Sequence, residues 1–244
     1  MKKFFPTLAL FAVAALLGLT ALGCSTTGPT DQERAAAQAT PITKMAVLPF
    51  ERILPDNPTS SEVSCPVTGA CYQAGDIAPE AEKVLGVALM QELNATTTLQ
   101  LVPPDQSERV LMAVGGRRLD IGTRQQIAEM GRKVGADAVM ACYVYRYVER
   151  VGGPMTAESP AAVTFDLAVV RSKDGQVIWK NSFDEKQQAL SEDLLNVGQY
   201  MRYGLRWFSA DELAHIGITR ILQRFPWRKP GLEEQTPLPT GAEK

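Results

Sequence analysis

Four apolar residues in succession, Met45 to Leu48, followed by Pro49, form the stretch that most constrains the fold of this chain. A half-exposed strand alternates polar and apolar residues, whereas a continuous apolar run is typical of a strand that is covered on both faces. Pro49 has no N–H to donate, so we expect it to end the hydrogen-bonded ladder. The run therefore predicts the founding strand of a sheet that is buried between two layers.

Alternating helix and strand patterns follow this run. Apolar spacing predicts helices at about 79–94, 105–114 and from 123, and strands at 99–102, 139–148, 163–170 and 177–183. Residues 172–175 predict a tight turn because Gly175 can take a positive φ, so the last two strands are expected to be antiparallel. Further helices are expected from Ser191 and from Ser209, which forms a capping box with Glu212. These patterns predict an α/β fold, a three-layer mixed sheet of about five strands in the order β-α-β-α-α-β-β-β-α, with C-terminal helices.

The amino terminus resembles a bacterial lipoprotein signal. Two lysines precede an uncharged, largely apolar run from Phe4 to Leu22, which leads into Gly23 and Cys24. In such signals the cysteine becomes the lipidated first residue, and several acyl chains anchor a protein stably. The alternatives are a plain signal peptide and one membrane-spanning helix, which needs about 20 apolar residues. The small residues before Cys24 favour a lipoprotein, and Ser25 after it implies, by the resemblance, the periplasmic face of the outer membrane.

These patterns divide the chain into four parts. Residues 1–23 are the expected signal peptide, residues 24–43 a flexible tether, residues 44–226 a single α/β domain, and residues 227–244 a disordered tail. The tether is rich in Ser, Thr, Ala, Gln and Pro, and fully stretched it reaches about 63 Å. We therefore expect the domain to stay near its membrane.

The composition is that of an ordinary globular protein, with 45% apolar and 21% charged residues. Lys2 and Lys3 belong to the expected signal peptide, so 23 of the 25 basic residues remain against 27 acidic ones, a formal charge of −4. This balance gives phosphate-rich partners no general attraction. We therefore expect no nucleic-acid partner.

Residues 51–78 contain several prolines and glycines without a sustained period and predict a long loop. Cys65 and Cys71 lie six positions apart within it, in a chain expected to reach an oxidising compartment, and they predict a disulfide. A metal site is the alternative, but the only histidine, His215, lies 144 residues further on, which makes a poor ligand set. We therefore expect no metal, and we expect Cys142 to be a small buried thiol.

The sequence contains no recognisable set of catalytic residues. His215 lies on a predicted helix, where a surface or hydrogen-bonded histidine explains it better than catalysis does. Nucleophile elbow and Walker loop are absent, and Gly115-Gly116 lacks the further glycines of a dinucleotide loop. We therefore expect a protein that is not an enzyme and has no cofactor; a site built of carboxylates alone is the catalytic arrangement that the sequence leaves open.

An aromatic and basic segment near the carboxyl end is the candidate partner-binding site. It consists of Tyr200, Met201, Arg202, Tyr203, Arg206, Trp207 and Phe208. Aromatic residues, Arg and Met are enriched in protein interfaces, so Tyr200, Arg202, Tyr203, Arg206 and Trp207 are the expected contacts. The alternative is that Tyr203, Trp207 and Phe208 fill the core under the sheet while the arginines face water.

Three short motifs resemble, by their order and spacing, domains of bacterial envelope proteins. They are Met45-Ala-Val-Leu-Pro-Phe50, Gly135-Ala-Asp-Ala-Val139 before a long strand, and Asp174-Gly175 followed by Val177-Ile-Trp179. Over roughly residues 43–226 the chain is similar to the amino-terminal domain of TolB, the lipoprotein activators of penicillin-binding proteins and the curli secretion lipoprotein. The resemblance implies a three-layer α/β domain that binds other envelope proteins and needs no cofactor.

We therefore expect an outer-membrane-anchored periplasmic lipoprotein that acts as a non-enzymatic adaptor or assembly factor of the cell envelope. The alternatives are an activator of a peptidoglycan synthase and an accessory component of an export or lipid-transport machine. The short tether counts against the activator, which must cross the peptidoglycan. The prolines of residues 51–78 count against the membrane strands of a pore, each of about 9 to 11 residues. Because ligands of α/β sheets gather at the carboxyl ends of strands, we expect any ligand near the loop after Phe50.

Overall fold

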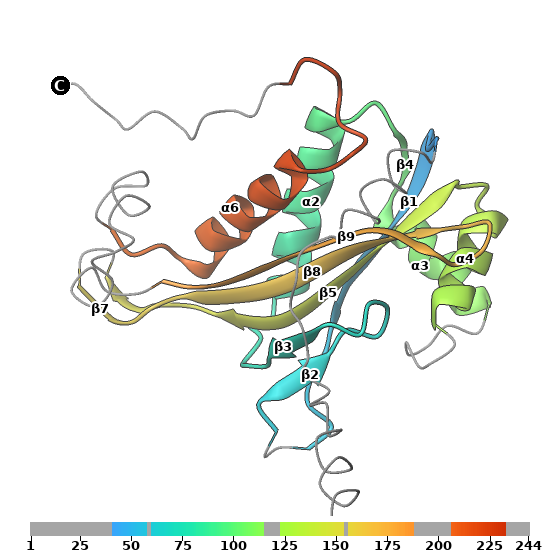
Figure 1. Cartoon of the computed structure of the whole chain (residues 1–244). Coiled ribbons are helices and arrows are strands. Elements are labelled where there is room, and N and C mark those ends of the chain that lie inside the picture. The colour runs from blue at the N-terminus through green and yellow to red at the C-terminus, as the bar shows by residue number, and fades with distance from the viewer. Residues whose placement is uncertain (1–40, 58–59, 115–122, 154–155, 188–205, 233–244) are drawn as a thin grey trace, which may run out of the picture.

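The computed structural model describes residues 41–57, 60–114, 123–153, 156–187 and 206–232 (Figure 1). Its main sheet has five strands in the order β4-β1-β5-β8-β9. Their bounds are Lys44–Arg52 for β1, Gln100–Val102 for β4, Ala138–Val148 for β5, Ala162–Arg171 for β8 and Val177–Lys186 for β9. β1 is parallel to β4 and β5, whereas β8 is antiparallel to β5 and β9. With helices on both faces, the expected three-layer α/β fold with a mixed sheet is confirmed.

β1 lies inside the sheet, and Met45, Ala46 and Val47 are fully buried. The strand does not end at Pro49 as expected. Its register with β5 shifts between Val47 and Phe50, and pairing then continues as far as Arg52. A bulge accommodates a residue that has no N–H to donate, so a proline can lie within a strand that carries on. Because of the bulge, Val47 and Phe50 both belong to the same apolar cluster, on the side of α2 and α6.

Asp137, in the motif Gly135-Ala-Asp-Ala-Val139 at the start of β5, has a structural role. One oxygen of its carboxylate accepts hydrogen bonds from the backbone N–H of Lys44 at 2.9 Å and from the N–H and hydroxyl of Thr43, each at 2.8 Å. These bonds, with that of Lys44 the strongest influence, lower the pKa of Asp137 although burial acts in the opposite direction. The start of β1 is thereby fastened to the start of β5.

Helices α2 (Ala81–Thr96) and α6 (Ala210–Gln223) cover one face of the sheet (Figure 1). Their buried residues form one apolar cluster with the strands, in which Trp179 meets Phe225 edge to face at 5.0 Å between ring centroids. The expected capping box at the start of α6 is confirmed. The Ser209 hydroxyl accepts from the N–H of Glu212 at 3.1 Å, and the Glu212 carboxylate accepts from the N–H of Ser209 at 2.9 Å.

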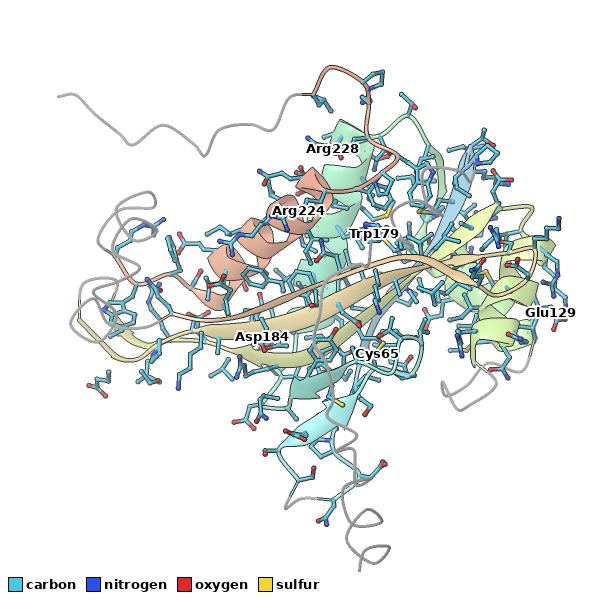
Figure 2. The ribbon with its side chains drawn as sticks, in the orientation of Figure 1. Cys65, Glu129, Trp179, Asp184, Arg224 and Arg228 are labelled. Atoms are coloured by element: carbon cyan, nitrogen blue, oxygen red, sulfur yellow. The ribbon has the colours of Figure 1, made fainter. Side chains whose placement is uncertain are left out.

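Helices α3 (Pro104–Ala113) and α4 (Thr123–Lys133) lie on the opposite face, together with a hairpin of strands β2 (Glu62–Ser64) and β3 (Cys71–Gln73). Ile127 and Met130 of α4 are fully buried against this face. In Figure 2, Cys65 is labelled on the face of the sheet that carries the β2–β3 hairpin, and Trp179 on the face that carries α2 and α6. Within the described residues, no helix has the length and apolarity needed to cross a membrane.

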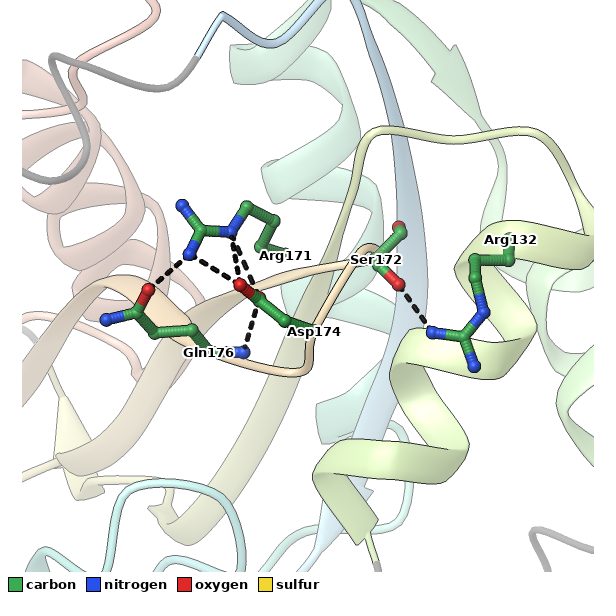
Figure 3. Close-up of polar contacts among 5 residues, drawn as sticks. All are labelled: Arg132, Arg171, Ser172, Asp174 and Gln176. Carbon is green, nitrogen blue, oxygen red and sulfur yellow. Dashed lines mark hydrogen bonds and ion pairs between the residues drawn. The ribbon is translucent and has the colours of Figure 1, made fainter.

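The turn between β8 and β9 matches the expected geometry, since Gly175 has a φ of +74°. Figure 3 shows its polar contacts. Arg171 forms an ion pair with Asp174 at 2.7 Å, and the Asp174 carboxylate also accepts the N–H of Gln176 at 3.1 Å. Arg132 of α4 donates to the carbonyl of Ser172 at 2.6 Å. The turn is therefore held both by its own side chains and by the helix beside it.

Residues 51–78 are more regular than the sequence predicts. Besides the β2–β3 hairpin, residues 75–78 run beside the end of β5, in line with β1. The N–H groups of Gly75 and Ala78 donate to β5 carbonyls, each at 3.0 Å, and the carbonyl of Asp76 accepts the N–H of Tyr147 at 2.8 Å. A side chain at Gly75 would approach Arg146 to 2.7 Å, which explains a glycine at this close contact.

Two further segments extend the fold. Strands β6 (Val151–Gly153) and β7 (Thr156–Ser159) form a second small hairpin, which prolongs β5 and β8 into an arm beyond α6 (Figure 1). At the carboxyl end, Arg228 bridges to Thr97, and the Nζ of Lys229 donates to the carbonyl of Ala95 at 2.8 Å. These contacts carry the fold beyond the expected boundary at residue 226, because the chain closes over the end of α2.

Candidate functional site

The predicted site residues fall in different parts of the structure. Cys24, Tyr200, Arg202 and Tyr203 lie outside the described residues, as does the helix expected from Ser191. Arg206 and Trp207 are described, and they lie in the segment that enters α6. His215 is exposed on α6, as expected for a histidine on a helix surface.

Gln187 holds the segment that contains Arg206 and Trp207. Its buried side-chain amide donates to the carbonyl of Arg206 at 2.8 Å and accepts the N–H of Phe208 at 2.7 Å. Arg206 forms an ion pair with Glu212 at 2.8 Å, and its guanidinium lies 5.3 Å from the centroid of the Phe208 ring. The backbone and the arginine are therefore ordered before any partner arrives.

The end of β5 is brought to this segment by Arg150, whose guanidinium donates to the carbonyl of Trp207 at 3.0 Å. The neighbouring Glu149 accepts the N–H of Ala210 at 3.0 Å, at the amino terminus of α6, where the helix dipole favours an acid. Val151, the next residue of the arm, is 54% exposed although it is apolar. We call Arg150, Val151, Arg206 and Trp207 the arm surface.

The burial of Arg206, Trp207 and Phe208 tests the two interpretations of the aromatic segment, an interface or part of the core. Phe208 is 8% exposed and belongs to the core, as the alternative interpretation expects. Trp207 is only partly buried and Arg206 is exposed, which suits surface contacts. The sequence offers no signal for Arg150 and Val151, because 56 residues separate Val151 from Trp207 and only the folded arm brings them together.

The predicted pairing of Cys65 with Cys71 is wrong for this structure, in which Cys65 is a free, buried thiol and Cys71 is disulfide-bonded, but not to Cys65. Cys71 lies opposite Ser64 in the ladder, and Val63 lies opposite Tyr72. Side chains alternate along a strand, so Cys65 follows Val63 and Tyr72 toward the sheet while Cys71 shares the other face with Ser64. The two sulfur atoms therefore point to opposite faces of the hairpin. Cys142 is a free, buried thiol as expected.

A cluster of polar side chains lies buried between the hairpin and the sheet, and we call it the Asp166 cluster. It consists of Cys65, Tyr72, Tyr145 and Asp166. The hydroxyls of Tyr145 and Tyr72 donate to the two carboxylate oxygens of Asp166, at 3.0 and 3.2 Å. The two tyrosine rings are stacked, with centroids 4.2 Å apart. Asp166 is 2% exposed and stands in the middle of an apolar strand.

Burial sets the acidity of the Asp166 cluster. It raises the pKa of Asp166 to about 6, although contacts with Cys65, Tyr145 and Tyr72 favour the carboxylate and act against it. Burial, followed by the charge of Asp166, raises the pKa of the Cys65 thiol to about 11. A thiol in this state is a poor nucleophile, so the Asp166 cluster lacks the activated cysteine of a covalent catalyst.

The carboxyl end of β1, where a ligand was expected, is occupied by the protein itself. The guanidinium of Arg52 donates to the carbonyls of Ile77, Ala78 and Pro79 at 3.3, 3.0 and 2.9 Å and forms an ion pair with Glu82. Among the described residues, no group of three or more His, Cys, Asp and Glu side chains is placed to hold a metal ion.

No protein-family model matches the chain, and neither does any curated protein. Several solved structures have a backbone that is similar to that of this chain. The PelC dodecamer from Paraburkholderia phytofirmans is 13% identical, with 84% of this chain and 96% of PelC covered and a TM-score of 0.42. The LpoB C-terminal domain from Salmonella enterica is 17% identical, with 64% and 93% covered and a TM-score of 0.35. Lipoprotein GNA1162 from Neisseria meningitidis is 13% identical, with 66% and 99% covered and a TM-score of 0.37.

At such identities and TM-scores, these similarities assign neither a family nor a function to the chain. One of these proteins is named a lipoprotein, which is a statement about that protein alone. The parts of the predicted resemblance that concern TolB and the curli secretion lipoprotein stay predictions.

Proposed function

We propose that this protein is a lipid-anchored lipoprotein of the bacterial envelope, on the periplasmic face of the outer membrane, that binds another envelope protein through the arm surface. In this proposal it acts as an adaptor or assembly factor, without catalysis and without a cofactor. The lipoprotein-like signal around Cys24 supports the anchor. The hydrogen bond between Arg150 and Trp207 is the observation that carries the binding site, since it joins the arm to the aromatic segment.

The composition of the arm surface supports a role in protein binding. It combines a partly buried tryptophan, two arginines and an exposed valine, and tryptophan and arginine are enriched where binding energy concentrates. The ion pair of Arg206 with Glu212 and the hydrogen bonds of the Gln187 side chain limit the conformations of this surface in the free protein. A restricted surface loses less conformational entropy when a partner binds.

Site-specific photocrosslinking in intact cells tests the proposal. A photoreactive amino acid replaces Val151 in the full-length chain and, as a matched control, Val87 on the outer face of α2, which is 51% exposed. We expect a discrete protein adduct from position 151, absent from position 87, and at least tenfold weaker when Trp207→Ala is added. Equal adducts from the two positions, or an adduct that Trp207→Ala leaves unchanged, would contradict the proposal.

The identity of the adduct then distinguishes the possible roles. A peptidoglycan synthase would support the activator, and a transport subunit would support the accessory component of an export or lipid-transport machine. Any other discrete envelope protein would support the adaptor. Recovery of abundant porins alone, at both positions, would remove support from all three roles.

A further inference from the structure

The β2–β3 hairpin has few hydrogen bonds of its own. Each strand has three residues, and a two-stranded hairpin of this size is not stable alone in water. It is packed on the sheet through the side chains that it turns inward, which are Val63, Cys65, Val67 and Tyr72. Among these, Tyr72 makes the most specific contacts, because it both stacks on Tyr145 and donates to Asp166.

Every element around Asp166 contributes polar or charged groups. The hairpin contributes Cys65 and Tyr72, β5 contributes Tyr143 and Tyr145, and β9 contributes Lys180 and, directly opposite Asp166, Ser182. Lys180 is the cation among them and favours the carboxylate, but burial outweighs it. The hydroxyl of Tyr143 is buried and has no hydrogen-bond partner among the described residues, so it would gain one if water entered.

We propose that the β2–β3 hairpin is a flap that lifts from the sheet, and that its lifting is coupled to the ionisation of Asp166. The closed flap keeps water from the carboxyl group and favours its neutral form, whereas lifting hydrates it and favours the carboxylate. Between about pH 4 and pH 6, lifting therefore releases a proton. The inference concerns the face opposite α6 and is independent of the arm surface.

The sign of the coupling follows from the acidity of the two states. With the flap closed the pKa of Asp166 is about 6, and in water an aspartate has a pKa of about 3.8. Below the lower value both states hold the proton, and between the two values only the closed flap does. The preference for the closed flap is thus complete below about pH 4 and declines as the pH rises through 6. The equilibrium constant for opening is expected to rise about 100-fold over this range.

Hydrogen exchange of the full-length protein in detergent micelles, between pH 4 and 7, tests the flap. After correction for intrinsic exchange, we expect the amides of Val63, Cys65 and Tyr72 to be at least tenfold less protected at pH 7 than those of β8. Their protection should fall about 100-fold from pH 4 to pH 7. In Asp166→Asn the change should shrink to less than about threefold, whereas Asp105→Asn on exposed α3 should behave as the wild type.

Two outcomes would overturn the inference. One is equal protection of the hairpin and of β8 at every pH, which would mean that only global unfolding exposes Asp166. The other is an undiminished pH dependence in Asp166→Asn. If that variant does not fold, Tyr72→Phe provides the test, because it keeps the ring and removes a hydrogen bond that favours the carboxylate. The midpoint of the protection change should then move to higher pH, and an unmoved midpoint refutes the coupling.

Discussion

Arg52 holds together three segments that meet at the end of β1. Its guanidinium binds three successive backbone carbonyls, those of Ile77, Ala78 and Pro79, and the carboxylate of Glu82 in the first turn of α2. The side chains of Arg52 and Glu82 are 33% and 29% exposed, so water screens the pair only in part. Replacing Arg52 by Ala removes all of these contacts, and Arg52→Lys keeps the charge without the planar fork.

The cost of Arg52→Ala follows from these contacts. Three hydrogen bonds at a net value of roughly 0.5–1.5 kcal/mol each, and a partly exposed ion pair of about 0.5 kcal/mol, are not additive within one side chain. We expect the free energy of unfolding to fall by about 2–3 kcal/mol. Arg52→Lys should lose about 1–2 kcal/mol, because an ammonium can reach Glu82 but cannot bind three carbonyls in one plane.

Equilibrium unfolding in urea at pH 7 measures the effect, with Lys83→Ala as the control. Lys83 pairs with Glu80, but both side chains are more than 70% exposed, so this loss should stay below about 0.5 kcal/mol. The effect also depends on pH. Although burial opposes it, the bond from Arg52 lowers the pKa of Glu82, so the contribution of the pair is present above about pH 4.5 and lost as the pH falls through the lowered value. A loss below 0.5 kcal/mol in Arg52→Ala, or equal losses in Arg52→Ala and Lys83→Ala, would refute the reasoning.

Three further predictions concern single residues. The unfolding free energy of the wild type should lose a component of about 3 kcal/mol as the pH rises from 4 to 7 through the raised pKa of Asp166, and urea titrations of Asp166→Asn should lack this component. Ser209→Ala should cost about 1 kcal/mol in the same assay because α6 loses its cap, whereas Ser209→Thr keeps a hydroxyl and should cost less than about 0.5 kcal/mol; equal losses in the two variants would contradict the cap. Cys24→Ser should move the protein from the membrane pellet to the soluble fraction, and a variant that stays in the pellet contradicts the lipid anchor.

The order of the main elements could be predicted from the sequence because it rests on local patterns. The apolar run at Met45, the turn at Gly175 and the capping box at Ser209 each act within a few residues, and the structure contains all three. The bulge at Pro49 was missed because the sequence shows the missing donor but not the shift of register that accommodates it.

The β2–β3 hairpin could not be predicted in this way. Strands of three residues show no period. These two strands are held by contacts of Tyr72 with Tyr145 and Asp166, which follow it by 73 and 94 positions. The same contacts determine the direction of the Cys65 side chain. Because Tyr72 faces the sheet, the thiol of Cys65 also faces the sheet and points away from Cys71. One signal was available, because a single acid at Asp166 within an otherwise apolar strand indicates a buried partner.

The parallel pairing of β1 and β5 has a mechanical consequence for an anchored protein. The expected tether precedes β1, whose start is fastened through Thr43 and Asp137, and the arm leaves from the end of β5 at Val148. In the proposed function, a pull between the membrane and a partner on the arm would therefore act on opposite ends of two neighbouring parallel strands. Their hydrogen bonds are loaded together in shear and do not open one after another. In the proposed arrangement, the sheet would therefore transmit tension along its strands without unzipping.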